Sequence, residues 1–190
     1  MRTVKNETFF HFSTSTNYQE GKSYSFGDKL NNFYRFYENY NPAITADEAE
    51  KNVILSEYTK YIRECIFEEV RQKEFPDYPS RTKCIWLAPP SLESLKFWRA
   101  QLPEARSLVK FTCSGLVHES DERFLTTMYF NFPLQRKLAE LYWSGENVSE
   151  NVNSREVLFY GTATAVEIYE LQPRDLRIPD AATLGIPGSM

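Results

Sequence analysis

The sequence predicts a single α+β domain, in which strand-like and helix-like segments follow one another without strict alternation. Three observations support this prediction. The chain has 190 residues, the size of one ordinary domain, and 42% of them are hydrophobic. Residues 46–75 carry one long helical pattern, while several short runs rich in aromatic and β-branched residues are typical of strands. We assign residues 1–180 to this domain and residues 181–190 to a tail outside it.

The first half of the chain predicts two strands and the long helix. Residues 8–13 (TFFHFS) form an aromatic run between polar residues, which is typical of a strand. A shorter strand or turn is expected between Gly21 and Gly27. In the long helix, apolar and aromatic side chains recur at three- and four-residue spacing. We expect Thr45 to cap this helix, and its apolar face to include Ile54, Tyr58, Tyr61, Ile62, Cys65 and Val70.

The second half predicts three more strands and two shorter helices. The expected strands cover residues 82–88, 107–113 and 155–171, and Gly161 marks a break in the last one. The expected helices cover residues 91–102, with Ser91 as the cap, and 133–143.

Composition excludes several classes of protein. The net charge of −4 argues against a general DNA-coating surface, which needs to be basic. The three cysteines form no CxxC pair and there are only two histidines, which excludes a zinc ribbon and a multi-histidine metal site. No GxGxxG or GxxxxGK motif is present. Without a signal segment or an apolar run near the ~20 residues that span a membrane, we expect a cytoplasmic protein with no membrane partner.

Two segments combine aromatic residues with polar groups. In Phe9–Thr14, His11 stands mid-strand and is followed by Ser13 and Thr14, although a half-buried histidine that bonds a backbone carbonyl is the commoner explanation of such a pattern. In the second segment, a strand containing Trp86 ends at Ala88, and the helix that follows carries Phe97 and Trp98. Packing of the core accounts for that pattern as well.

The third segment places Glu156 just before an apolar strand and after a polar loop. A charge at a strand edge is common, so the pattern alone does not assign a function. Glu167 and Glu170 are the competing carboxylates further along the same strand. They have opposite parity, so a regular strand directs at most one of them toward the core.

In order and character, the three segments resemble the ADP-ribosyltransferase family, closest to its poly(ADP-ribose) polymerase-like and diphtheria-toxin-like branch. That family has a histidine in its first core strand, an aromatic strand end before a helix with a second aromatic residue, and a glutamate entering a late strand. Here Trp86 stands where the family usually has Tyr. The stretch Phe75–Arg81 (FPDYPSR) also resembles a small family of uncharacterised bacterial proteins.

The resemblance implies a split, mixed β-sheet core with flanking helices, built as two small facing sheets, and NAD as the substrate. Glu156 would stabilise the ribose cation formed when nicotinamide leaves, as in glycoside hydrolysis. His11 would bind the adenosine ribose with help from Ser13 or Thr14. The remaining implied contacts are Trp86 with Phe97 or Trp98 around the nicotinamide ring, and Arg81 at the pyrophosphate. A solvated loop arginine explains Arg81 equally well.

The resemblance also implies a macromolecular acceptor, either a protein or a single-stranded nucleic acid, and no metal. A toxin or defence effector of this kind would carry a neutralising partner. Three alternatives stay open: an NAD glycohydrolase, an RNA 2′-phosphotransferase, and a non-catalytic nucleotide- or protein-binding module on the same scaffold.

Overall fold

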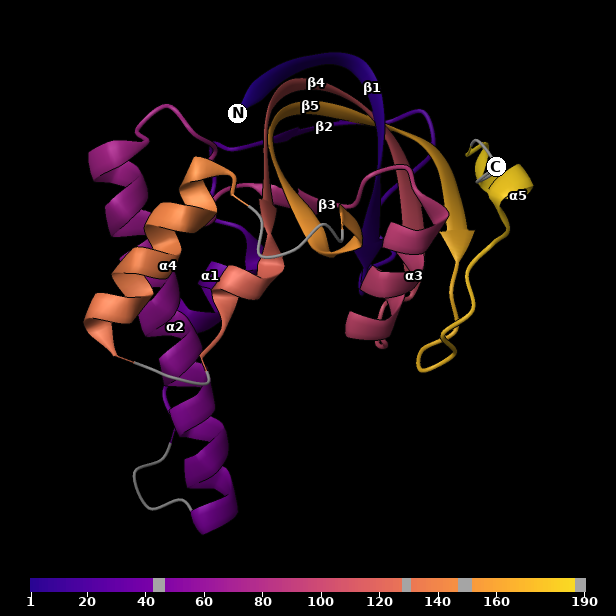
Figure 1. Ribbon diagram of the computed structural model, residues 1–190. Coiled ribbons are helices and arrows are strands. Elements are labelled where there is room, and N and C mark those ends of the chain that lie inside the picture. The colour runs from indigo at the N-terminus through magenta and orange to yellow at the C-terminus, as the bar shows by residue number, and fades with distance from the viewer. Residues whose placement is uncertain (43–46, 128–130, 147–151, 187–190) are drawn as a thin grey trace.

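The computed structural model describes residues 1–42, 47–127, 131–146 and 152–186 as an α+β fold, as the sequence predicts. All of its strand pairings are antiparallel, and they form one sheet in the order β1-β4-β5-β2, with β3 also paired to β5 (Figure 1). The strands are β1 (Arg2–Ser13), β2 (Ser23–Phe26), β3 (Ile85–Leu87), β4 (Ser107–Asp121) and β5 (Arg155–Glu170). The helices are α1 (Asn32–Glu38), α2 (Glu48–Glu74), α3 (Leu92–Gln101), α4 (Phe132–Ser144) and α5 (Ala181–Leu184), with short 3₁₀ turns at Glu122–Leu125 and Val152–Ser154.

The two longest strands bend where a pair of glycines faces each other. Gly115 in β4 lies opposite Gly161 in β5, with φ angles of 158° and 145°. A Cβ atom on Gly161 would lie 2.5 Å from the carbonyl oxygen of Ser114, so only glycine allows the two backbones to approach this closely. The sheet therefore curls over (Figure 1). The expectation of two facing mixed sheets is wrong, because one continuous antiparallel sheet bends at this pair instead.

A single bridge joins the two ends of the curled sheet. The amide of Phe10 donates to the carbonyl of Ala88 at 3.0 Å, and the amide of Ala88 donates back to Phe10 at 2.7 Å. Strand pairing thus runs from β1 through β4, β5 and β3 and returns to β1. This closure brings the middle of β1 beside the end of β3, although the two segments are far apart in the sequence.

Each face of the sheet is buried. One face carries a single cluster that includes Phe9, Phe111 and Phe159. The other face carries two clusters: Phe10 and Leu108 pack with Leu95 of α3, while Leu158 packs with residues of α2 and α4. The helices thus cover the second face as two groups, one on each side (Figure 1).

The long helix α2 matches the predicted span but starts differently. Its N-cap is Asp47, whose side chain accepts from the amide of Glu50, and Thr45 lies outside the described residues. The predicted buried face is partly wrong. Cys65 is exposed, and the buried positions are Glu64, Ile66, Phe67 and Val70. The buried face of α2 differs from the predicted one because it includes Glu64, whose carboxylate is paired inside the protein.

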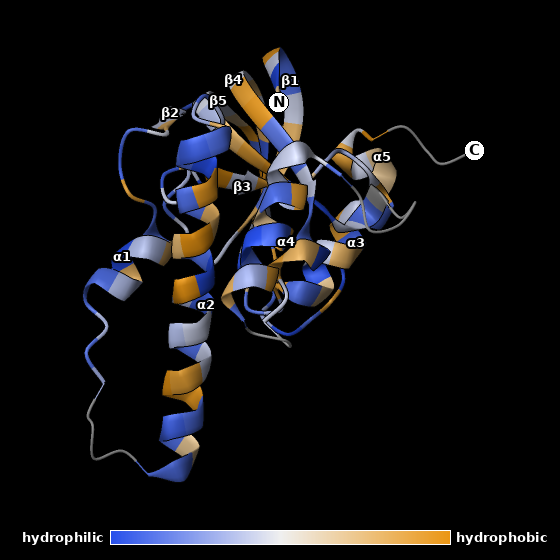
Figure 2. Ribbon diagram, turned by 60° about the vertical axis from the view of Figure 1, so that its left-hand side comes forward, coloured by the Kyte–Doolittle hydropathy of each residue, from blue (hydrophilic) through white to orange (hydrophobic). Residues whose placement is uncertain are grey.

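The N-terminal half of α2 extends away from the sheet beside α1 (Figure 2). Val53 and Leu55 are 60% and 66% exposed there. Aromatic side chains hold α1 to this half of the helix, and the rings of Tyr37 and Tyr61 stack with centroids 5.0 Å apart.

Residues 181–186 do not belong to the tail that the sequence suggested, and residues 187–190 lie outside the described residues. Asp180 caps α5, and Leu184 and Ile186 are buried against Phe10 and Leu108. Residues 181–186 therefore belong to the domain, because their apolar side chains complete one of its core clusters. None of the helices within the described ranges is both long and apolar enough to cross a membrane.

Candidate functional site

A cleft of about 570 Å³ opens between the two groups of helices. Its walls come from α2, α3 and the closed end of the sheet, so segments from the whole length of the domain meet there. The resemblance implies that His11, Trp86 and Glu156 converge on one cleft, and this convergence is confirmed. Its lining residues are Phe10, His11, Phe12, Phe33, Lys60, Arg63, Glu64, Arg81, Trp86, Leu87, Ala88, Trp98, Gln101, Leu102 and Glu156.

His11 is held in its neutral form at the edge of the cleft. Its Nδ1 lies 2.9 Å from the carbonyl oxygen of Trp86. Because a carbonyl only accepts, Nδ1 carries the proton and Nε2 is left as an acceptor. Burial lowers the pKa of His11 to about 4, although the bond to Trp86 opposes this shift. At neutral pH, the imidazole therefore presents an uncharged acceptor.

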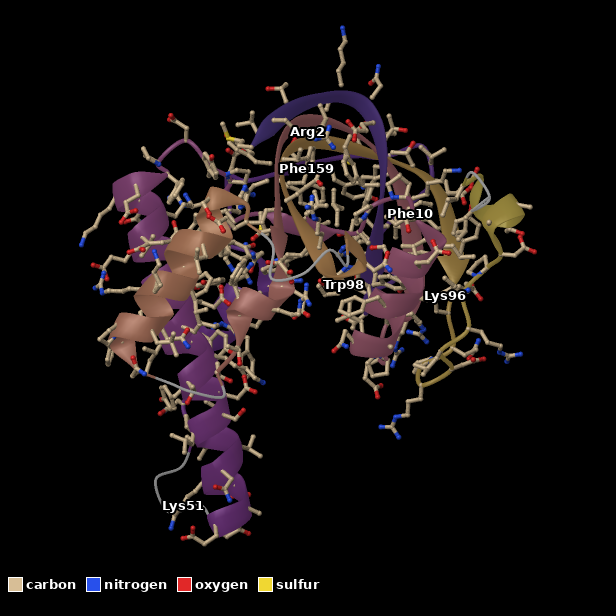
Figure 3. All side chains as sticks on the ribbon, viewed as in Figure 1. Arg2, Phe10, Lys51, Lys96, Trp98 and Phe159 are labelled. Atoms are coloured by element: carbon tan, nitrogen blue, oxygen red, sulfur yellow. The ribbon has the colours of Figure 1, made fainter. Side chains whose placement is uncertain are left out.

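Two indole rings line the cleft. Trp86 is half-buried, with the ring of Phe33 edge-on to it at 5.9 Å. Trp98, labelled in Figure 3, projects from α3, and its Nε1–H donates to the carbonyl of Arg155 at 3.0 Å. This bond ties α3 to the start of β5, next to Glu156. Of the two aromatic candidates on α3, Trp98 lines the cleft, whereas Phe97 packs edge-on against Trp98 and does not.

Glu156 lies on the cleft wall with one oxygen anchored. Its Oε1 accepts from Nη1 of Arg81 and from the hydroxyl of Tyr142. In the described part of the chain, Oε2 has no hydrogen-bond partner, and Glu156 is only 5% exposed. The carboxylate is therefore fixed in place with its second oxygen available to a ligand.

Arg81 occupies the centre of a buried ionic network, so its interpretation as a solvated loop residue is wrong. Its Nε donates to Glu64 at 2.7 Å, and its Nη1 donates to Tyr142 at 2.7 Å as well as to Glu156. The guanidinium is 4% exposed. A fourth bond runs from its Nη2 to Glu64 at 3.3 Å. Because these four bonds to protein groups engage all three nitrogens of the guanidinium, Arg81 is also badly placed for its predicted role at a pyrophosphate.

Charge pairing outweighs desolvation in this network. Burial disfavours the charged form of Glu64, but Arg81 and Arg63 more than offset this and lower its pKa to about 2. Burial likewise disfavours the Arg81 cation, but Glu156 and Glu64 raise its pKa well above the ordinary value. Burial also raises the pKa of Tyr142 well above its usual range, although Arg81 opposes this shift. Tyr142 therefore stays a hydrogen-bond donor.

Ser13 and Thr14 do not reach the cleft, contrary to their predicted role beside His11. The hydroxyl of Ser13 donates to the carbonyl of Ser15 and accepts from its amide, at 3.0 and 3.1 Å, and Thr14 is exposed. These bonds complete a turn that ends β1, because serine hydroxyls readily satisfy nearby backbone groups.

The competing carboxylates of β5 lie outside the cleft. Glu167 contacts Lys110 and Tyr169 with its side chain 44% exposed, and Glu170 is exposed. Glu156 is thus the carboxylate of this strand that faces the aromatic residues, as the sequence predicts.

Sequence reasoning missed Glu64, Tyr142 and Phe33. Glu64 and Tyr142 lie inside helices, where a lone glutamate is usually solvated and a lone tyrosine usually packs in the core. No local pattern distinguishes them. Among the residues that the structure describes, no group of three or more histidine, cysteine or acidic side chains is arranged to hold a metal ion.

Comparison with known proteins assigns a family without an activity. No curated protein matches the chain. Residues 9–171 match the family model described as protein of unknown function DUF2441, and this match takes in every residue of the cleft wall named above. The chain belongs to the DUF2441 family.

Proposed function

We propose that this cleft binds NAD and cleaves its nicotinamide–ribose bond, with transfer of ADP-ribose to a macromolecular acceptor. One observation carries the proposal: a neutral histidine, two half-buried indole rings and an anchored carboxylate, from three distant segments, share one cleft. This set of groups matches the chemistry of the bond, which needs a stacking surface for a flat ring and a negative charge near the ribose.

In the proposed reaction, Glu156 acts on the ribose carbon from which nicotinamide leaves. As the bond between nicotinamide and the ribose breaks, both bonding electrons leave with nicotinamide, and the ribose carbon gains positive character. The Glu156 carboxylate, fixed by Arg81 and Tyr142, stabilises that charge without having to reorganise. The acceptor then forms a bond to the same carbon and loses a proton.

The other cleft residues position the substrate. Trp86 and Trp98 offer aromatic faces for the nicotinamide ring. Nε2 of His11 accepts a hydrogen bond from a ribose hydroxyl, because its neutral form is held by Trp86. We further propose that the curled sheet is a variant of the ADP-ribosyltransferase fold, with the histidine in its first strand and the glutamate in its last.

Labelled NAD tests the activity. We expect the purified protein to release nicotinamide, and label to appear on macromolecules when cell lysate is added. Free ADP-ribose without labelled macromolecules would replace the transferase with an NAD glycohydrolase. Neither product, at protein concentrations that bind NAD, would favour the non-catalytic binding module.

Glu156→Gln tests the mechanism. Turnover should fall roughly 100-fold or more, because one electrostatic stabiliser is lost. NAD affinity should change little, because the interaction grows mainly in the transition state.

Because Glu156 belongs to the buried ionic network, Glu156→Gln should also affect the stability of the fold. Because Arg81 loses a charged partner in a buried site, Glu156→Gln should also lower the free energy of unfolding by about 1–3 kcal/mol. Turnover must therefore be measured well below the melting temperature of the variant. Glu167→Gln, on the same strand but exposed, is the matched control and should retain full activity. Full turnover in Glu156→Gln would remove Glu156 from the mechanism.

A further inference from the structure

A second cavity of about 480 Å³ adjoins the cleft. The two share His11, Phe33 and Trp86 as a common wall. The rest of the second cavity is formed by the segment between β2 and α1 and by the residues that lead into β3. A ligand that crosses the shared wall would therefore occupy both cavities.

Cations of the second cavity lack carboxylate partners. Lys29, Arg35 and Lys83 line it, and across the described ranges none of the three forms a salt bridge. In the first cleft, by contrast, Lys60 and Arg63 are each paired with a glutamate, as is Arg81. Of the described residues that line the second cavity, Asp28 is the only one with a carboxylate. Three unpaired cations around one concavity favour an anionic ligand there.

The fold fixes these cations around the cavity. Asn31, which caps α1, donates from its side chain to the carbonyls of Arg81 and Cys84 at 2.7 and 3.2 Å. Its backbone amide donates to Thr82 at 2.9 Å. These bonds tie the segment that carries Lys29 and Arg35 to the segment that carries Lys83. The tertiary structure thus places these three residues around one cavity.

We propose that this second cavity binds the diphosphate of a nucleoside diphosphate. Its size suits a mononucleotide, and lysine and arginine are the usual partners of phosphate oxygens. Arg81, the sequence-based choice for the diphosphate, is already engaged with Glu64 and Glu156, so Lys29, Arg35 and Lys83 take that role. This proposal rests on the proposed function in one respect: it takes the ADP half of NAD as the source of the diphosphate.

Binding of ADP, measured by titration calorimetry, tests the proposal without any need for catalysis. We expect ADP to bind at least about ten-fold more tightly than adenosine, because the phosphates supply the added contacts, and its affinity to fall as salt is raised. The triple substitution Lys29→Gln, Arg35→Gln and Lys83→Gln should weaken ADP binding by roughly ten-fold or more and leave adenosine binding unchanged.

A second triple substitution provides a control of equal charge. Lys5→Gln, Lys96→Gln and Arg106→Gln also remove two lysines and one arginine, none of which lines the cavity or forms a salt bridge within the described residues. Figure 3 shows Lys96 on the side of α3 away from Trp98. We expect this variant to bind ADP within about two-fold of the unmodified protein, because screened charges outside the cavity contribute little. All six side chains are exposed, so thermal melts should show both variants folded.

The outcomes separate this proposal from the proposed function. Equal affinity for ADP and adenosine, no ADP binding, or equal weakening in both triple variants would overturn the diphosphate cavity. ADP binding that depends on Lys29, Arg35 and Lys83 in a protein that does not cleave NAD would support the cavity and refute only the catalytic proposal. The Glu156→Gln protein should bind ADP normally, because Glu156 does not line this cavity.

Discussion

At the scale of single residues, the site depends on how two buried glutamates share one arginine. Arg81 bonds Glu64 and Glu156, and Arg63 adds a second cation at Glu64. The four charges balance, which is what makes their burial tolerable. The position of Glu156 is therefore set by the fold and not by solvent, which is what the proposed reaction requires of a charge that stabilises a developing cation.

Tyr142→Phe tests how far this network depends on one hydroxyl. Tyr142 is fully buried, donates to Glu156 and accepts from Arg81 at 2.7 Å. Removal of the hydroxyl while the ring is kept should lower the free energy of unfolding by about 1–3 kcal/mol, because two charged groups lose a partner. Urea denaturation measures this loss. The control Tyr160→Phe, at a residue 42% exposed, should stay within about 0.5 kcal/mol. Equal stability of the two variants would show that the network does not need the hydroxyl.

At the scale of elements, the bend in β4 and β5 gives the sheet its closed shape. The bend places β3 where it can meet β1 at Phe10 and Ala88. That closure in turn holds His11 against the carbonyl of Trp86. A local feature of two strands therefore determines the spacing of the cleft residues.

Gly161→Ala should destabilise the protein by about 2–4 kcal/mol, because it combines a strained φ of 145° with a Cβ atom 2.5 Å from the carbonyl oxygen of Ser114. Gly145→Ala is the matched control. Its φ is 79°, but its Cβ would lie at an ordinary 3.7 Å from the nearest atom, so only the backbone strain of about 1–2 kcal/mol remains. Thermal melts compare the two, and a smaller loss at Gly161 would contradict the close approach of the strands.

A second prediction at this scale concerns the C-terminal helix α5. Leu184 is fully buried with Phe10 and Leu108, so Leu184→Ala should cost about 2–5 kcal/mol of unfolding free energy. Leu176, 55% exposed and nearby in sequence, should tolerate the same change within about 0.5 kcal/mol. Chemical denaturation of both variants measures the difference. A neutral Leu184→Ala would mean that residues 181–186 are a tail after all.

At the scale of the whole molecule, stability should fall in acid. His11 and His118 are neutral when folded, because burial lowers the pKa of each to about 4. In the unfolded chain they take up protons near pH 6.5, so between pH 6.5 and 4 the unfolded state binds more protons and stability falls as pH falls. Glu64 extends the loss of stability to lower pH. Its folded pKa of about 2 gives stability that is present above about pH 4.5 and is lost toward pH 2.

Urea denaturation at pH 7 and pH 5 checks this prediction. His118 is 1% exposed, and its Nε2 lies 3.1 Å from the carbonyl oxygen of Tyr142. We expect His118→Asn to lose about 1–2 kcal/mol less than the unmodified protein between the two pH values. Glu167→Gln, at an exposed carboxylate, should show the same loss as the unmodified protein. An unchanged pH dependence in His118→Asn would mean that the pKa of His118 is the same in the folded and unfolded states.

The sequence by itself determined the elements whose signals are local. The span of α2, the cap of α3 at Ser91 and the break of β5 at Gly161 all follow from periodicity, capping and glycine chemistry within a few residues. The family resemblance, and not a local signal, singled out His11, Trp86 and Glu156, which line one cleft in the structure. The second half of β4 escaped prediction because its alternation is interrupted at Ser114 and Gly115, and only pairing with β1 and β5 shows that it is a strand.

Only the tertiary structure decided which side chains meet. Arg81, Glu64 and Glu156 come from a loop, a helix and a strand, and no local pattern distinguishes a buried, paired glutamate from a solvated one. The sequence also did not show the pairing that removes Arg81 from phosphate binding. Nor did it show that Lys29, Arg35 and Lys83 form no salt bridge with any residue that the structure describes. The physical reason is that periodicity reports the environment of a residue along its own element, whereas the partner of a charge depends on how distant elements pack.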